Sequence, residues 1–240
     1  KEDAQIVPVH SPPHLQKCKT LLPFWRFSQH FRKTILPPKH QEGFPMKEIG
    51  HWINGKLVAG TSGRFSDIYN PATGEVQARV ALATVAELNS AIADAAKAQI
   101  GWAATNPQRR ARVMMAFGAL INQHMDKLAE LVSREHGKTI PDAKGDVQRG
   151  LEVIEVCMGA PAFLKGEMTD NAGPDIDIYS MRQALGVVAG ITPFNFPAMI
   201  PLWKMGPALA CGNAMILKPS ERVPSTSLFL AELLKEAGLP

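Results

Sequence analysis

The chain has 240 residues, of which 45% are hydrophobic and 20% are charged, and its formal net charge is +4. Such a composition suits a globular protein with one large domain or two small ones, and no apolar run reaches the ~18 residues that a membrane-spanning helix needs. The positive charge comes from residues 1–45, which hold seven Lys or Arg and three Asp or Glu. Because the rest of the chain is electrically balanced, its charge gives no support for binding to nucleic acid.

Residues 1–45 also hold seven of the 19 prolines and show no apolar periodicity. A basic segment that is poor in acidic residues is typical of an organellar transit peptide, which would make the protein mitochondrial. The repeated prolines argue against the amphipathic helix that such a peptide forms. We therefore favour a disordered or non-native extension before Met46, and a cytoplasmic protein.

Two hairpins are predicted next. "HWINGKLV" places Asn54-Gly55 between two short apolar pieces, and this pair tolerates positive φ at both turn positions. "FSDIYNPATGEVQARV" repeats the pattern around Asn70-Pro71, with Gly74 closing the turn. The body of the chain therefore begins with short antiparallel strands.

Helices dominate the middle of the chain. Thr84 and Glu87 have the spacing of a capping box, and Asn106 followed by a proline marks the start of a second helical pattern. That pattern continues until Gly137, and a further helix is predicted over residues 141–158. The apolar residues at helical spacing include Leu88, Ile92, Ala95, Val147, Leu151 and Ile154.

After Gly173 short strands alternate with helices. Residues 176–183 alternate as a half-exposed strand does, while "LGVVAGI" and "AMIL" are apolar throughout, as strands covered on both faces are. Helices are predicted over residues 197–210 and 224–237. The order strand, helix, strand, helix indicates an α/β fold with a doubly wound parallel sheet. The chain ends at "AGLP", where a further strand is expected, so the predicted sheet is truncated.

The segment "GITPFNFPAMIPLWK" holds Asn195 between two prolines. Pro193 fixes the backbone on one side and Pro197 keeps the preceding residue extended, so we expect the amide to be held in place. Such an amide can donate to a developing oxyanion, and a donor of that kind is worth roughly 3–4 kcal/mol of barrier. The alternative is a hydrogen bond to the local backbone in a turn, which is the commoner use of Asn and which these residues alone favour.

Lys218 stands at the end of a predicted strand, and Glu221 follows three residues later. In a doubly wound sheet, ligands bind outside the carboxyl ends of the strands, so this pair of side chains can hold the two hydroxyls of a ribose. The alternative is a solvated loop ion pair that also involves Arg222, worth under about 1 kcal/mol.

Arg149 lies off the apolar stripe of its predicted helix, and Gly145 and Gly150 leave room beside it. Its guanidinium can bind a carboxylate through two parallel hydrogen bonds. The spacing alone favours an exposed arginine that pairs with Asp146 or Glu152.

The three cysteines, Cys18, Cys157 and Cys211, have no zinc spacing and no disulfide framework, which fits a reducing compartment. Cys157 lies among apolar residues at helical spacing, and Cys211 ends a predicted helix, so both are expected to be small packing residues. None of the three is predicted to be a nucleophile.

Together, "PFNFP", "WKMGPALACGN" and "LKPSE" resemble the aldehyde dehydrogenase superfamily over roughly residues 46–240. "REHGKTIPDAKGDVQRGLEV", "FLKGE" and "ITPFNFPAMIPLW" are similar in particular to its methylmalonate-semialdehyde dehydrogenases, which acylate coenzyme A. The segment would be about the N-terminal two-fifths of such an enzyme. Ala184 stands where the family usually has proline, and Lys204 is closer to general aldehyde dehydrogenases than to that branch.

The resemblance implies a role for each candidate residue. Asn195 would be the side-chain half of an oxyanion hole. Arg149 would bind the carboxylate that distinguishes a malonate-type semialdehyde from a simple aldehyde. The other candidates would bind NAD, with Thr192 and Phe194 along the loop, Lys218 and Glu221 on the adenosine ribose, and Arg222 beside them.

The resemblance also divides the chain. Residues 46–175 would form the hairpins and helices of the NAD-binding domain, residues 176–191 an oligomerisation strand and its return strand, and residues 192–240 the start of a Rossmann-like sheet. The enzyme would be a homo-oligomer, either a dimer or a tetramer. Its catalytic cysteine would lie beyond Pro240, so the chain by itself is expected to be inactive.

The implied reaction is the NAD-dependent oxidation of methylmalonate or malonate semialdehyde, with coenzyme A as cosubstrate. A cysteine thiolate attacks the aldehyde, hydride passes to NAD, and coenzyme A releases propionyl-CoA or acetyl-CoA with loss of CO₂. Two alternatives stay open. One is a general aldehyde dehydrogenase that releases a carboxylic acid, and the other is a non-catalytic fragment that binds partners or nucleotide through its sheet.

Overall fold

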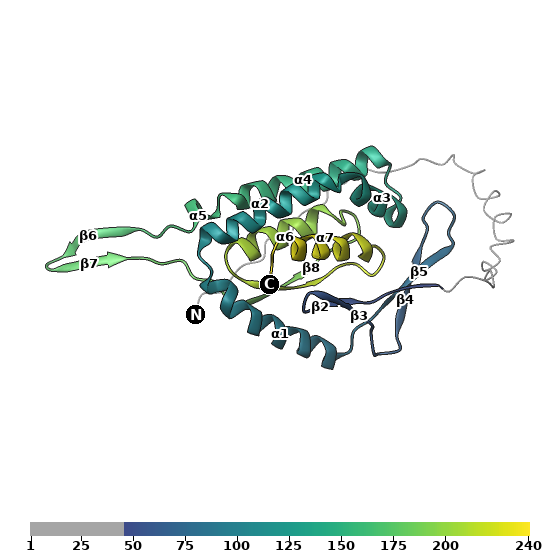
Figure 1. Cartoon of the computed structure of the whole chain (residues 1–240), viewed down its shortest axis with the longest axis horizontal. Helices are drawn as coiled ribbons and strands as arrows, with labels where there is room; N and C mark the ends of the chain where they lie inside the picture. Colours follow the sequence, from purple (N-terminus) through teal and green to yellow (C-terminus); the bar gives the residue numbers. More distant parts are fainter. Residues whose placement is uncertain (1–45) are drawn as a thin grey trace, which may run out of the picture. The chain divides into compact units, whose positions relative to one another are not determined.

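The computed structural model describes residues 46–240, and the predictions for residues 1–45 lie outside the described residues. Both predicted hairpins are confirmed (Figure 1). The first turns through Asn54 and Gly55, whose φ angles of 53° and 68° are the positive pair that its tight turn needs. The five strands of this part are β1 (Lys47–Ile49), β2 (His51–Ile53), β3 (Lys56–Val58), β4 (Phe65–Tyr69) and β5 (Val76–Ala81).

These strands make two small sheets. Strands β2 and β3 pair with each other, while β5 pairs antiparallel with β4 on one side and parallel with β1 on the other. The second hairpin closes through Asn70, whose N–H donates to the carbonyl of Glu75 over 2.8 Å. Gly74, at φ 75°, takes the left-handed conformation that the turn requires.

The helical middle of the chain follows its predicted boundaries closely. Thr84 and Glu87 form the expected capping box, and the backbone amides of Thr84 and Thr61 lower the pKa of Glu87 to about 2. The single pattern predicted from Asn106 to Gly137 is broken at His124 into two helices. The helices are α1 (Val85–Ala104), α2 (Pro107–Gln123), α3 (Met125–His136), α4 (Ile140–Met158) and the short α5 (Ala160–Phe163).

The apolar spacing of α1 does not mark a buried stripe. Leu88 and Ile92 are 43% and 39% exposed, whereas Trp102 at the end of the helix is buried and donates to the carbonyl of Leu209 over 2.8 Å. Helical spacing shows that residues share a face, but burial depends on what packs against that face.

The last part of the chain has the predicted order strand, helix, strand, helix. Strands β8 (Val187–Ile191) and β9 (Ala214–Lys218) pair in parallel, α6 (Met199–Ala210) connects them, and α7 (Pro224–Glu236) follows. Helices α1 and α6 both pack against the strand pair (Figure 1). The fold class is therefore α/β with a parallel sheet, as the sequence indicates. Both strands are only partly covered here, and Ile191 is 74% exposed.

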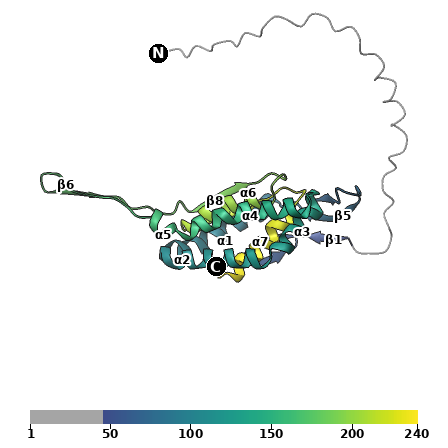
Figure 2. The same ribbon diagram turned by 90° about the horizontal axis from the view of Figure 1, so that it is seen from above.

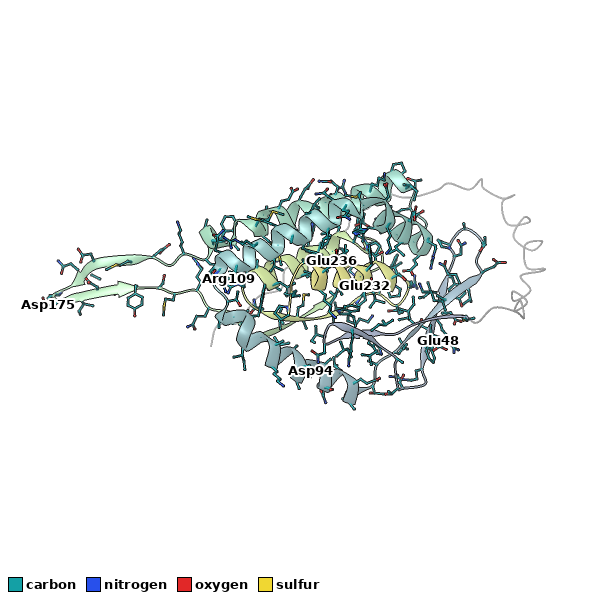
Figure 3. All side chains as sticks on the ribbon, in the orientation of Figure 1. Glu48, Asp94, Arg109, Asp175, Glu232 and Glu236 are labelled. Atoms are coloured by element: carbon teal, nitrogen blue, oxygen red, sulfur yellow. The ribbon has the colours of Figure 1, made fainter. Side chains whose placement is uncertain are left out.

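Two strands, β1 and β6, were not predicted. Strand β6 (Met168–Gly173) pairs antiparallel with the predicted β7 (Ile176–Tyr179), and this hairpin extends away from the helices (Figure 2). Asp175 marks its tip in Figure 3 and has a φ of 57°. Ile176 and Ile178 alternate as expected but are 54% and 58% exposed, so neither face of β7 is covered.

The main core lies between α2, α3, α4, α6 and α7, where most of the fully buried large side chains meet. Helices α4 and α6 pack very closely at Gly150, because a Cβ atom there would stand 2.4 Å from Leu202 Cδ1 and 3.1 Å from Met199 Cα. The indole of Trp203 on α6 also donates to the carbonyl of Arg149 over 3.0 Å. Within residues 46–240 no helix is both long and apolar enough to cross a membrane.

Glu135 on α3 is a buried carboxylate at the start of α7. The residue before that helix, Val223, gives no side-chain cap, and Glu135 Oε2 instead accepts from the N–H of Ser225 over 3.1 Å. Burial raises the pKa of Glu135, and its other oxygen has no hydrogen-bond partner among the described residues. This carboxylate therefore anchors the helix that follows β9.

Replacing Gly150 by alanine should lower the free energy of unfolding by about 1–3 kcal/mol, because the added methyl group collides with Leu202 and the backbone of Met199. Gly145→Ala is the matched control on the same helix, since nothing lies within 4 Å of its Cβ position. That change should stabilise the chain by up to about 1 kcal/mol through helix propensity. Urea unfolding of both variants measures the two effects, and equal effects of the same sign would contradict the close contact.

Glu135→Gln should change how stability depends on pH. The folded pKa of Glu135 is raised above 4.5, so the stability linked to its protonation is full below that value and is lost as pH rises through the folded pKa. Glutamine keeps an oxygen for Ser225 and does not titrate. The unfolding free energy of the variant minus that of the wild type should therefore increase from about pH 4 to pH 8. A difference independent of pH would show that Glu135 titrates normally.

Candidate functional site

Two loops meet at one edge of the parallel strand pair. The loop 192–198 leaves the end of β8, and the loop 219–223 leaves the end of β9. Since the two strands are parallel neighbours, their carboxyl ends lie side by side, and the N–H of Thr192 donates to the carbonyl of Lys218 over 3.1 Å. This edge is where ligands bind in doubly wound sheets.

Phe194 is held from two sides in the first loop. The guanidinium carbon of Arg222 lies 5.1 Å from its ring centroid, and the imidazole of His136 stacks on it at 6.4 Å with an interplanar angle of 29°. Burial, together with the nearby Lys138, lowers the pKa of His136, so the imidazole is neutral at neutral pH. Two predicted site residues, one from each loop, are thus in direct contact.

Lys218 and Glu221 form an ion pair with an Nζ–Oε2 distance of 2.9 Å. Both side chains are largely exposed, at 59% and 43%, so the pair contributes little to stability. The backbone amide of Glu221 and the Lys218 ammonium lower the pKa of the Glu221 carboxyl. Arg222 contacts Phe194 and forms no ion pair with Glu221 in the described part of the chain.

Asn195 is exposed in the same loop, and its amide takes part in no hydrogen bond among residues 46–240. The turn in which Asn195 would bind its local backbone, which the residues alone favoured, is therefore not formed. Thr192 is buried at 4%, and its Oγ1 has no partner among the described residues. The side-chain amide of Asn195 is free to bind a ligand.

Arg149 lies on α4, outside the two loops. It is exposed on α4, and within the described residues its guanidinium joins no ion pair. Asp146, its expected partner, pairs with Lys138 over 3.0 Å and accepts from the N–H of Met199 over 2.8 Å. The five proposed NAD-site residues and Asn195 therefore lie on or beside the two loops, whereas Arg149 lies on α4, where its carbonyl accepts from the Trp203 indole of α6.

The sequence reasoning missed His136 at the end of α3, Lys138 in the α3–α4 connection and Asp146 on α4, which contact the loop of Asn195 or the start of α6. One signal was available. Asp146 falls on the apolar stripe that includes Val147 and Gly150, and an acidic residue on a buried face needs a partner.

The described cysteines match their predicted role as packing residues. Burial raises the pKa of Cys157 to about 11, and neighbouring Cys211 contributes to the shift. A thiol with that pKa is not a thiolate at neutral pH, and Cys211 is partly buried at the end of α6. Cys18 lies outside the described residues.

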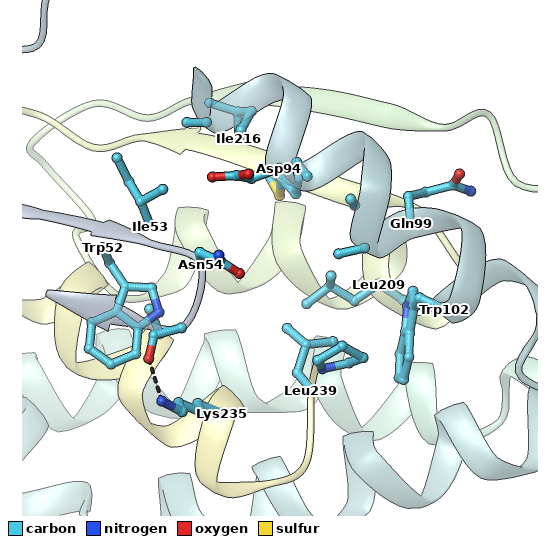
Figure 4. A pocket seen from close by; sticks show the side chains of 18 of the residues that line it. Trp52, Ile53, Asn54, Asp94, Gln99, Trp102, Leu209, Ile216, Lys235 and Leu239 are labelled. Carbon is cyan, nitrogen blue, oxygen red and sulfur yellow. Dashed lines mark hydrogen bonds between the residues drawn. The ribbon is translucent and has the colours of Figure 1, made fainter. Parts of the chain in front are cut away.

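A pocket of about 200 Å³ lies elsewhere, between α1, β9, α7 and the turn that joins β2 to β3 (Figure 4). Trp52, Asp94 and Leu239 line it, and Lys235 donates from its edge to the carbonyl of Gly55. None of the predicted site residues lines this pocket. We therefore place the candidate site at the edge formed by the two loops.

Comparison with known proteins identifies relatives along most of the chain. A malonate-semialdehyde dehydrogenase of Pseudomonas aeruginosa is 52% identical over 196 residues, which are 81% of this chain and 39% of that protein. The human mitochondrial acylating methylmalonate-semialdehyde/malonate-semialdehyde dehydrogenase is 46% identical over 189 residues, covering 79% of this chain and 35% of that protein. The chain thus spans less than two-fifths of the length of these two relatives.

Solved structures give the same result. A protein of Sinorhizobium meliloti, provisionally assigned as a methylmalonate-semialdehyde dehydrogenase and crystallised with NAD, is 64% identical with a TM-score of 0.80. The match covers 82% of this chain and 40% of that one. The model of the aldehyde dehydrogenase family matches residues 57–240, which include both loops of the candidate site. The chain belongs to the aldehyde dehydrogenase family.

Proposed function

We propose that the chain is part of an NAD-dependent enzyme that oxidises malonate or methylmalonate semialdehyde to acetyl-CoA or propionyl-CoA with loss of CO₂. The observation that supports this proposal is the hydrogen bond from Thr192 to the Lys218 carbonyl, which ties the start of the Asn195 loop to the strand end that carries the Lys218–Glu221 pair. The names of the Pseudomonas and human relatives support the substrate, and the word "acylating" in the human name supports coenzyme A.

The residues at this edge fit the adenosine half of NAD. Glu221 is an exposed carboxylate that can accept from ribose hydroxyls, and the Lys218 ammonium beside it can donate. Phe194 presents an aromatic surface, 46% exposed, that Arg222 holds in place. When bound, NAD would accept the hydride that the aldehyde carbon loses.

Asn195 would act on the reacting aldehyde oxygen. Its amide is exposed and has no protein partner in the described residues, so it can donate to the oxygen as negative charge develops there. An amide does not titrate, and this contribution would therefore be the same at every pH in the working range.

Arg149 would select the substrate by its carboxylate. Its guanidinium is exposed and free of ion pairs among the described residues, while its backbone is fixed to α6 by Trp203. A guanidinium matches the two oxygens of a carboxylate, which a semialdehyde of malonate type has and a simple aldehyde lacks.

The nucleophile would be a cysteine thiolate outside this chain. Cys157 has a raised pKa, and Cys211 is the partly buried C-cap residue of α6, so neither suits attack on an aldehyde. The chain covers 39% of the Pseudomonas relative, and we propose that the remaining part of the enzyme supplies the thiolate. On this proposal the 240-residue chain alone is inactive.

The hairpin β6–β7 supports a homo-oligomer, a dimer or a tetramer. Both of its strands are exposed, and the apolar side chains of Met168, Ile178 and Tyr179 on them are 58–69% exposed. Exposed apolar side chains on a protruding strand pair are typical of a surface that another subunit covers. The expected compartment, the cytoplasm, stays a prediction, since the human relative is named as mitochondrial.

A general aldehyde dehydrogenase that releases a carboxylic acid is the second candidate function. Lys204, exposed on α6, is the residue that favours it, because it is closer to general members of the family. Dependence on coenzyme A separates the two functions. Turnover with water alone, unaffected by coenzyme A, would favour the general enzyme.

Asn195→Ala in the complete enzyme that contains these residues should lower kcat by about 10²–10³, because one donor to the oxyanion is lost. The dissociation constant of NAD should change little, since the Lys218–Glu221 pair is untouched. Steady-state kinetics and NAD titration measure the two effects. An unaltered kcat would remove Asn195 from the oxyanion role.

Arg149→Ala should raise KM for a carboxylated semialdehyde by about 10-fold or more and leave KM for propanal unchanged, because only the first substrate loses a charged hydrogen bond. Propanal is the control substrate, because a folding defect would change the kinetics for both substrates alike. Equal changes for both substrates would mean that Arg149 acts through structure rather than through recognition.

A further inference from the structure

Helix α6 begins without a cap of its own. Its N-cap residue is Ala198, which has no side chain that can accept from the first-turn N–H groups. Asp146 on α4 supplies the missing acceptor, since its Oδ1 lies 2.8 Å from the N–H of Met199. A carboxylate at this position also interacts favourably with the positive end of the helix dipole.

The second oxygen of Asp146 holds a cation against the same loop. Its Oδ2 binds the ammonium of Lys138 over 3.0 Å, and the Asp146 side chain is completely buried. Lys138 Nζ in turn lies 4.0 Å from the ring centroid of Phe196, the residue directly after Asn195. One buried carboxylate thus binds the start of α6 directly and Phe196 through Lys138.

The part of α4 that carries Asp146 is packed tightly against α6. One helical turn after Asp146, α4 packs so closely against α6 that Gly150 has no room for a side chain. The carbonyl of Arg149 on α4 also accepts from the indole of Trp203 on α6. The loop of Asn195 is therefore fixed at its entry by the hydrogen bond from Thr192 to Lys218 and at its exit by Asp146. Asn195 itself makes no side-chain hydrogen bond within residues 46–240, so its place depends on these two ends.

We propose that Asp146, together with Lys138, is a positioning residue that sets where the amide of Asn195 stands relative to the reacting aldehyde. This inference rests on the proposed function for its catalytic consequence. The buried Asp146 side chain would touch neither substrate nor NAD, and its whole effect on the reaction would pass through the loop. A shift of about 1 Å in such a group can reduce a rate by about 10²-fold.

The first experiment compares variants of the complete enzyme. Asp146→Ala removes both interactions and should lower kcat by about 10- to 100-fold. Asp146→Asn keeps an oxygen for Met199 and loses the ion pair with Lys138, so it should recover only part of that loss. Glu155→Ala, which removes an exposed carboxylate from the same helix, is the matched control and should leave kcat unchanged.

A double variant separates positioning from simple loss of structure. If Asp146 acts through Asn195, Asp146→Ala should lower kcat much less in an Asn195→Ala background than in the wild type. An equal loss in both backgrounds would overturn the proposal, and so would a kcat for Asp146→Ala equal to that of the wild type. If the complete enzyme oxidises no aldehyde, the proposed function is refuted, and the effect of Asp146 on the loop is then tested by the second experiment alone.

The second experiment uses the 240-residue chain and does not need activity. Amide hydrogen exchange should become faster in Asp146→Ala at residues 195, 196 and 198–200, by about 10-fold or more at Met199, and stay unchanged in Glu155→Ala. Asp146→Asn should retain most of the protection at Met199. Unchanged exchange at Met199 would overturn the proposal, and a uniform increase over the whole chain would assign Asp146 a general structural role instead.

Discussion

The parallel pairing of β8 with β9 is the arrangement on which the candidate site depends. Because the strands run in the same direction, the chain leaves both of them at one edge, although residues 192 and 218 are far apart in sequence. The hydrogen bond from Thr192 to the Lys218 carbonyl extends this pairing into the two loops. At the opposite ends of the strands, Asn213 Oδ1 accepts from the N–H groups of Leu185 and Gly186, which fixes their register.

The two helices that follow these loops share a second constraint. Neither α6 nor α7 has a side-chain cap from its own N-cap residue, and a buried carboxylate from the α3–α4 region takes that place in each case. The two carboxylates differ in their charge balance. Asp146 has the Lys138 ammonium beside it, whereas burial raises the pKa of Glu135, which within residues 46–240 accepts a hydrogen bond from Ser225 and joins no ion pair. The same capping geometry thus occurs with a charge-paired carboxylate at α6 and with a carboxylate whose charged form is disfavoured by burial at α7.

The local features of the fold could be predicted because each depends on a few adjacent residues. The Asn54-Gly55 turn, the Thr84–Glu87 capping box and the left-handed Gly137 are of this kind. The order of strands and helices after Gly173 also indicated the parallel pair correctly.

Long-range contacts could not be predicted in this way. The caps of α6 and α7 come from residues 53 and 90 positions earlier, and no spacing rule reaches that far. Strand β6 was missed because its residues, "MTDNAG", lack the apolar alternation that marked β7. The roles proposed for Asn195 and Arg149 depended on resemblance rather than on physics, since an exposed amide and an exposed guanidinium have many ordinary uses.

The contacts of Phe194 have a consequence for the energetics of binding. The Arg222 guanidinium and the neutral His136 imidazole both lie against the ring, and these contacts restrict its rotamers when the chain folds. A ligand that packs on the exposed part of the ring therefore meets a surface that is already ordered. Binding then avoids the roughly 0.5–1.5 kcal/mol that immobilising a free side chain costs. The affinity therefore gains from the order that the ring already has before the ligand arrives.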